Sequence, residues 1–423
     1  MKILKRRDFR DLMIGKAISM IGSNVQQFAL SLYVLSTTQS ATLFASMLAI
    51  SILPRIVLSP VAGVFGDWFD RKKAIVRLDV INGLLIGSYA LYFYVNDGLS
   101  LWSVYLLVIL LEIIEVFFGS AMGAVIPSMV NKKDLIEANR SRSMIMSLAN
   151  MMAPVLASAI YGVFGLFVVL VMNALSFLAS AFFENRIEIP AFHKQPTRLD
   201  FNSFKADFFD GLRVLKSHRV LTNIIGLGVF LNFSLSPLFS VGIVVIVMDV
   251  LKASEFELGL IMTISAVAMF VGPLLLGKKV QRVPMGQLLI MAFFTVGVLI
   301  VLMSVVSLNA TIQYIGYTQV IVALIALLMF LVALLTTVAN IAVGTLFDTL
   351  VPKEYFGRVG SVMNMSLMAT IPLGQILFGI SIDRISAPIT ILVVGIITLL
   401  ATLYFKNIFI EKEKSHDIQV LSS

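Results

Sequence analysis

Long apolar runs alternate with short polar segments along the whole chain. Each run is longer than the roughly 10 alternating residues of a membrane β-strand and matches the roughly 20 residues of a helix that spans a bilayer. The pattern therefore predicts an all-α protein, in which only Val163, Phe164 and Gly165 separate the fifth helix from the sixth. The twelve predicted helices cover residues 11–35, 42–66, 74–95, 101–130, 139–163, 165–183, 219–249, 257–277, 285–308, 315–346, 357–381 and 387–405.

One polar segment is much longer than the others and divides the predicted helices into two sets of six. Two sets of helices joined by a polar linker are typical of transporters built from repeated halves. We therefore expect an N-terminal six-helix half at 1–183, a linker at 184–218, a C-terminal six-helix half at 219–405 and a tail at 406–423.

The composition places these helices in a membrane. Hydrophobic residues make up 59% of the 423-residue chain and charged residues only 13%, with a mean hydropathy of +0.97. Such a chain cannot cover an apolar core with polar side chains, so we exclude a soluble enzyme, a nucleic-acid-binding protein and a disordered protein. The chain has no cysteine, and its three histidines lie in polar segments. We expect neither a metal site nor a cofactor.

Basic residues gather on one side of the predicted membrane. Of the 32 lysines and arginines, 28 fall in the N-terminal segment, the linker, the tail and every second loop, whereas Lys252 and Arg384 fall in the opposite loops. Lys16 and Arg55 fall inside predicted helices. Because lysine and arginine are enriched in cytoplasmic loops, we predict a multi-pass protein of the cell membrane with cytoplasmic termini and linker. The net charge of +8 is better explained by these basic cytoplasmic segments than by a surface that binds nucleic acid.

The loop after the second predicted helix carries a signature. It reads Gly63-Val-Phe-Gly-Asp67-Trp68-Phe-Asp-Arg71-Lys72. This run resembles the glycine–x–x–x–aspartate–arginine–x–x–arginine–arginine signature of the major facilitator superfamily, with Trp68 in place of the first arginine. The resemblance implies that superfamily's fold, with twelve transmembrane helices in two halves. It also implies that Gly63, Asp67 and Arg71 latch the outward-open state; the alternative is that the loop is only a tight, basic turn.

Other segments resemble the branch of that superfamily that holds macrolide-efflux and siderophore-export proteins. The fifth predicted helix keeps Pro154 but lacks the glycines that many proton-antiporting drug exporters have there, and Glu115 stands where many of them carry an arginine. With the loop signature, the resemblance covers essentially the whole chain. The segments are Leu53-Pro54, Ser59–Gly63, Val351–Val359 and Pro372–Gly374.

Three ionisable residues lie at membrane depth, where charge is costly and usually functional. Arg55 lies eleven residues from Gly66, which places it about 16 Å from the cytoplasmic end of its helix. Glu112 lies eleven residues from Leu101, about 16 Å from the outer end of its own, so the two can pair. Glu115 lies one turn beyond Glu112 on nearly the same face, and two such carboxylates repel. We predict that these three residues serve proton coupling or substrate binding; the alternative is a structural ion pair.

Uncharged polar residues form a second group of candidates. By resemblance, the first, fourth, seventh and tenth helices line the central cavity, which makes Asn24, Gln27, Asn232 and Asn340 candidate cavity residues. The alternative is that these side chains form hydrogen bonds between helices, worth about 0.6 kcal/mol each.

We expect a secondary transporter that exports a hydrophobic or amphiphilic small molecule, similar to a drug or macrolide, by proton antiport with alternating access. The alternatives are export of a siderophore or metabolite, or uptake by the same fold. The expected partners are the small-molecule substrate, protons and membrane lipids, with no nucleic acid, and we expect a monomer. No HExxH motif, paired histidines or GxxxxGK[ST] loop supports a membrane enzyme or an ATP-driven pump, and no filter segment supports a channel.

Overall fold

The computed structural model describes residue 3 and residues 6–68, 70–131, 134–188, 219–280, 284–351 and 356–421. All regular secondary structure in these ranges is helical, which confirms the predicted all-α fold. Nine helices within the described ranges are long and apolar enough to cross a membrane. The count of twelve membrane-spanning helices remains a prediction.

The chain divides into two compact units. The first comprises Met1–Gln39 and Met47–Phe201, and the second comprises Ser40–Ser46 and Asn202–Ser423. Helix α2 (Ala41–Trp68) therefore begins in the second unit and continues in the first. Most of the predicted linker lies outside the described residues, so the predicted division of the chain into halves, linker and tail stays a prediction.

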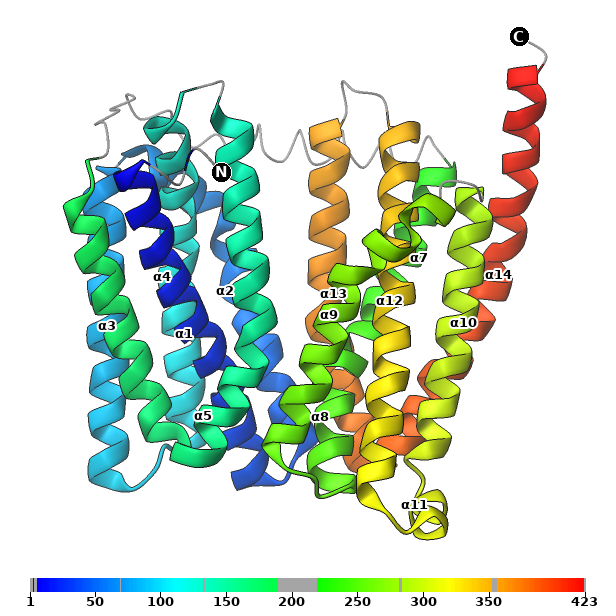
Figure 1. The fold of residues 1–423 in the computed structure, drawn as a ribbon, viewed down its shortest axis with the longest axis horizontal. Helices are drawn as coiled ribbons and strands as arrows, with labels where there is room; N and C mark the ends of the chain where they lie inside the picture. The colour runs from blue at the N-terminus through cyan, green and yellow to red at the C-terminus, as the bar shows by residue number, and fades with distance from the viewer. Residues whose placement is uncertain are drawn as a thin grey trace. The chain divides into compact units, whose positions relative to one another are not determined.

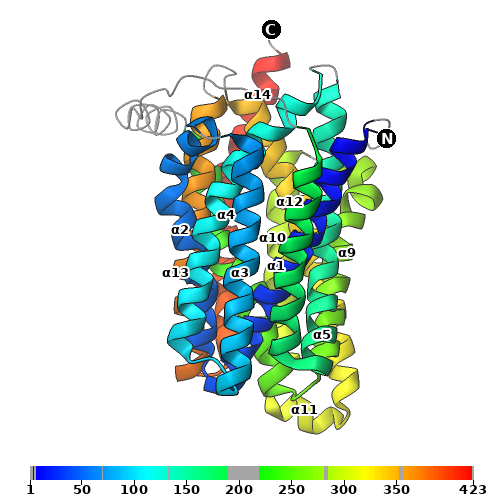
Figure 2. The same cartoon turned by 90° about the vertical axis from the view of Figure 1, so that its left-hand side faces the viewer.

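Helix α5 is the main packing partner in the first unit. It packs against α1 and α3, and α3 also packs against α4; Figures 1 and 2 show these helices running side by side. The four helices are α1 (Arg7–Thr38), α3 (Arg71–Asn96), α4 (Leu101–Met129) and α5 (Leu135–Arg186).

Helix α5 contains a sharp break at the position where the sequence predicts two helices. Gly165 has φ 73° and ψ −178°, a conformation that is essentially restricted to glycine. Figure 1 shows the chain reversing direction there. Residues 135–164 and 166–186 are therefore two antiparallel arms, which correspond to the fifth and sixth predicted helices.

A side chain at Gly165 should destabilise this reversal. We expect Gly165→Ala to lower the free energy of unfolding by about 1–3 kcal/mol, because alanine is strained at this φ and ψ. A lower thermal unfolding temperature of the purified variant would show this loss of stability. Gly119→Ala is the control, since an added Cβ there meets nothing within 4 Å and its helical backbone suits alanine. Equal unfolding temperatures for the two variants would contradict the expectation.

Glycines let the second arm of α5 approach α1 and α3 closely. A Cβ on Gly22 of α1 would overlap the Asn173 side-chain oxygen, and one on Gly15 would lie 3.2 Å from the Ser180 hydroxyl. On α3, a Cβ on Gly83 would come within 3.1 Å of the Ala174 carbonyl. These contacts bring polar side chains of three helices together inside an apolar bundle.

The second unit is built from helices of varied length and one irregular segment. Helix α10 packs against α12 and α14, α12 packs against α9, and α13 packs against α7. π-helical turns follow Pro237, as is common where a proline removes a backbone hydrogen bond. The elements are α7 (Arg219–Pro237), η3 (Leu238–Gly242), α8 (Ile243–Val245), η4 (Ile246–Val250), α9 (Glu255–Val280), α10 (Met285–Val306), α11 (Asn309–Ile315), α12 (Thr318–Leu350), α13 (Phe356–Arg384) and α14 (Ala387–Leu421).

Asp383, near the end of α13, caps the start of α2 within the second unit. Its carboxylate accepts hydrogen bonds from the Ser40 hydroxyl at 2.8 Å and from the backbone N–H groups of Ala41 at 2.8 Å and Thr42 at 3.0 Å. A carboxylate at a helix N-terminus satisfies free N–H groups and complements the helix dipole.

Loss of this cap should be measurable. We expect Asp383→Ala to lower the free energy of unfolding by about 0.5–2 kcal/mol, because two N–H groups at the start of α2 lose their acceptor. Thermal unfolding of the purified variant tests this. Alanine at the neighbouring, exposed Arg384 is the control, and an equal loss in both variants would argue against a capping role.

Candidate functional site

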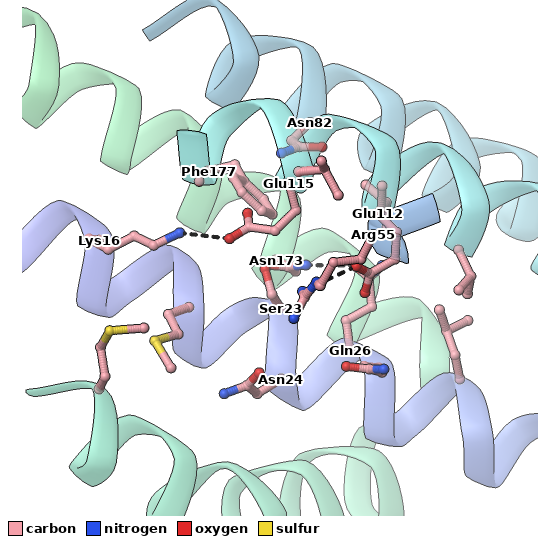
Figure 3. A pocket seen from close by; sticks show the side chains of 18 of the residues that line it. Lys16, Ser23, Asn24, Gln26, Arg55, Asn82, Glu112, Glu115, Asn173 and Phe177 are labelled. Carbon is pink, nitrogen blue, oxygen red and sulfur yellow. Dashed lines mark hydrogen bonds and ion pairs between the residues drawn. The ribbon is translucent and has the colours of Figure 1, made fainter. Parts of the chain in front are cut away.

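A cavity of about 780 Å³ lies among the helices of the first unit. Its walls come mainly from α1 and α4, with two residues from α2, one from α3 and three from α5. Polar and charged side chains from α1, α2 and α4 point into it, as Figure 3 shows. Apolar side chains such as Leu30, Val108 and Phe177 complete the lining, so the cavity offers both apolar surface and charge.

Two ion pairs cross this cavity. The Arg55 guanidinium on α2 lies 3.4 Å from the Glu112 carboxylate on α4, and the Lys16 ammonium on α1 lies 3.1 Å from the Glu115 carboxylate one turn further along α4 (Figure 3). Lys16 also lies 4.1 Å from the centre of the Phe118 ring. Each carboxylate thus has its own cation, which offsets the repulsion between the two.

Amide side chains fix the helix contacts around the ion pairs. The Asn173 amide on α5 donates to the Gln26 side-chain oxygen on α1 at 2.8 Å, and both residues are buried. Gln27 donates to the Ser51 hydroxyl on α2 at 3.3 Å. These bonds hold α1 against α5 and α2, which fixes the direction in which Asn24 and Lys16 point.

The structure brings together most of the predicted site residues of the first unit. Glu112, Glu115, Arg55, Asn24 and Gln27 all line the cavity. Arg55 contacts Glu112, the pair that their equal depth allows, while the partner of Glu115 is Lys16.

Other predicted residues lie elsewhere. Asn232 and Asn340 belong to the second unit and do not line this cavity. The Asn232 amide donates to the Gly228 carbonyl of its own helix at 3.0 Å, and Asn340 is exposed on α12. Arg71 is the first residue of α3, whereas Gly63 and the Asp67 side chain have no described contacts or burial. The latch role of this loop stays a prediction.

Sequence reasoning missed three ionisable residues of the first unit. Lys16 lies five residues after the start of the predicted helix 11–35, about 8 Å along it, so a charge inside a helix was visible in the sequence. Asp79 lies inside the predicted helix 74–95, and its charge in an apolar run was a usable signal. Glu184 gave no such signal in the sequence, because the prediction placed it in the linker. Only the structure shows that α5 extends to Arg186.

The arrangement can exchange charge partners. A proton on Glu112 or Glu115 would release the bound Arg55 or Lys16, and a cationic ligand could take the place of either basic side chain. Both changes happen at the cavity wall, so a ligand and a proton would compete for the same carboxylates. This is the chemistry that an exchange of substrate for protons requires.

Sequence comparisons identify the family. A sequence profile described as Major Facilitator Superfamily matches residues 12–374. Macrolide efflux protein A of Streptococcus pyogenes is 24% identical over 380 residues, which cover 89% of this chain and 90% of that protein. Macrolide efflux protein A of Enterococcus faecalis is 23% identical over 332 residues, which cover 78% of this chain and 98% of that protein.

Solved structures share the fold. A nucleoside transporter matches with a TM-score of 0.71 at 12% identity, over 95% of this chain and 99% of that one. A bacterial homologue of the iron transporter ferroportin, in an inward-facing state, matches with a TM-score of 0.68 at 15% identity, over 95% and 98%. Since the family profile spans well over half of the chain, the protein belongs to the Major Facilitator Superfamily and is a multi-pass membrane transporter, not an enzyme.

Proposed function

We propose that the protein exports an amphiphilic, cationic small molecule of macrolide-like size in exchange for protons, by alternating access. The observation that carries this proposal is the cavity of about 780 Å³ with two carboxylates, each held by a basic side chain, on a wall that combines apolar and uncharged polar side chains. Pockets for drug-sized ligands measure about 300–1,000 Å³.

The substrate class rests on the chemistry of the cavity wall. The apolar side chains favour an apolar ligand body, whereas Glu112 and Glu115 favour a protonated amine. A macrolide with an amino sugar has both features. The similarity to macrolide efflux proteins over most of the chain supports the same substrate class.

The proposed exchange of substrate for protons rests on carboxylates that can bind either of them. Because one carboxylate cannot hold a proton and a cationic ligand at once, proton entry would favour release of the ligand. In the proposed cycle, Glu112 and Glu115 bind in turn the substrate and the proton, and Arg55 and Lys16 occupy the carboxylates between these steps. Asn24 and Gln27 provide further polar contacts in the cavity.

We also propose that the protein resides in the cell membrane with both termini in the cytoplasm. The one-sided distribution of 28 basic residues supports this orientation. The structure adds that Arg6, before α1, donates to Asp134, after α4, at 3.0 Å. The N-terminus and this basic loop therefore lie at the same end of the first unit.

A growth assay tests the proposed function. A bacterial strain that lacks its own efflux pumps would express the protein and grow on a panel containing erythromycin, a siderophore and a neutral amphiphile. We expect the minimal inhibitory concentration to rise for erythromycin, and to return to the vector level with Glu112→Gln. Unchanged sensitivity to erythromycin, at a verified amount of protein in the membrane, would contradict the proposal.

A further inference from the structure

Two carboxyl groups of the first unit are buried away from the cavity. Asp79 on α3 is 1% exposed and Glu184 on the second arm of α5 is 0% exposed, and neither lines the cavity. Within the part of the chain that the structure describes, none of their four carboxyl oxygens has a hydrogen-bond partner. An ionised carboxylate in such a place carries a large desolvation cost.

Close helix contacts assemble this buried site. Gly83, one turn after Asp79, brings α3 against α5, and Gly15 brings α1 against Ser180 of α5. Ser180 and Glu184 are four residues apart and so lie on the same face of the arm. The Ser180 hydroxyl is 0% exposed and faces Asp79 without forming a hydrogen bond of normal geometry. A buried hydroxyl without a partner is therefore directed at the carboxyl group.

Charged groups of the cavity act on this site from the neighbouring helices. Lys16 of α1 and Glu115 of α4 lie within electrostatic range of both Asp79 and Glu184, and they pair with each other at 3.1 Å. Asn82, one turn from Asp79, lines the cavity, and its side-chain oxygen has no hydrogen-bond partner among the described residues. Lys16 and Asn82 thus adjoin both the cavity and the buried site.

The balance of charge identifies the ligand. If all were ionised, three carboxylates would face one ammonium, so two negative charges would lack a partner within this group. Each such charge calls for a bound cation. Among the described residues, no group of three or more acidic side chains or histidines is placed to hold a metal ion. A proton needs no such set of ligands, because it binds one carboxyl oxygen.

We propose that Asp79 and Glu184 form a proton-binding site behind the cavity, and that Lys16 links the two. With a proton on each of the two carboxyl groups, Lys16 pairs with Glu115, as in this structure. When a proton leaves, the new negative charge draws Lys16 away and frees Glu115 for a cationic ligand. This link to transport rests on the proposed function, whereas proton binding by the pair does not.

Infrared spectroscopy of the purified protein in lipid tests the site without any substrate. A protonated carboxyl group has a C=O stretching band that shifts in D2O. We expect the wild-type protein to show this band at mildly acidic pH, where exposed carboxyl groups are already ionised, and to lose it after a step to alkaline pH. The change should become smaller in Asp79→Asn and in Glu184→Gln, and smallest in the double variant. Asp97→Asn, which alters an exposed aspartate at the end of the same α3, should leave it unchanged.

The outcomes separate this inference from the proposed function. A wild-type protein without the band, or a double variant with the full band, would overturn proton binding whatever the protein transports. A band that sodium chloride removes at constant pH would show that sodium displaces the proton, and would overturn the inference that the site is specific for protons. If the band behaves as expected and erythromycin is not exported, the proton site stands and the proposed function fails.

Discussion

Glutamine at Glu112 or at Glu115 is expected to reduce proton-driven export to the level of empty membranes. Each glutamate is bound to one basic side chain at the cavity wall, at 3.4 Å for Glu112 and 3.1 Å for Glu115. Glutamine keeps the size of the side chain but can neither bind a proton nor attract a protonated amine. The reaction cycle therefore loses the group that substrate and proton share.

Export of erythromycin driven by a pH gradient, normalised to the amount of protein in the membrane, measures this effect. Glu188→Gln is the matched control, since Glu188 is exposed beyond the end of α5 and should retain wild-type export. Wild-type export in both cavity variants would show that these carboxylates have only a structural role, as the alternative reading of the sequence holds.

Lys16→Glu is expected to remove most of the protein from the membrane. Its side chain would place a fourth carboxylate beside Glu115, Asp79 and Glu184, where Lys16 now supplies the positive charge. Like charges at short range are destabilising, and a buried charge without a partner costs several kcal/mol. Lys16→Met leaves an uncharged side chain of similar length and adds no further negative charge, so we expect a smaller loss of stability than in Lys16→Glu, together with a loss of coupling.

A double variant in which the two charges are exchanged separates the effect of charge at position 16 from the effect of packing. Adding Glu115→Lys to Lys16→Glu restores one positive and one negative charge across the same 3.1 Å contact. We expect this double variant to recover the wild-type amount of folded protein, measured by fluorescence-detected size-exclusion chromatography. A double variant as depleted as Lys16→Glu would show that position 16 needs lysine for its packing over Phe118 and not for its charge.

The helices could be predicted well because hydropathy and length decide them. The predicted boundary between the fifth and sixth helices is confirmed, since Gly165 is the residue at which α5 reverses. The prediction that Arg55 and Glu112 lie at the same depth follows from the rise per residue of a helix, and the two side chains do meet.

Contacts between helices were harder to predict because they depend on which faces meet. Lys16 was visible in the sequence as a charge inside a helix, but nothing there showed that α1 turns it toward Glu115. Asp79 and Glu184 come together because small residues let α3 and α1 approach α5, and Glu184 also depends on where α5 ends. Sequence patterns show how deep a residue lies along its own helix. A site also depends on how several helices are oriented about their axes, which decides the side chains that face one another.

Transport by the purified protein in liposomes tests the central claim most directly. The liposomes would have an acidic interior, and radiolabelled erythromycin would be added outside. We predict that it accumulates inside, above the passive trapping of this weak base in protein-free liposomes, while the pH gradient lasts. The ionophore nigericin should abolish this extra accumulation, and Glu112→Gln liposomes should not exceed the protein-free level. Accumulation that is independent of the gradient, or that requires an alkaline interior, would contradict export by proton antiport.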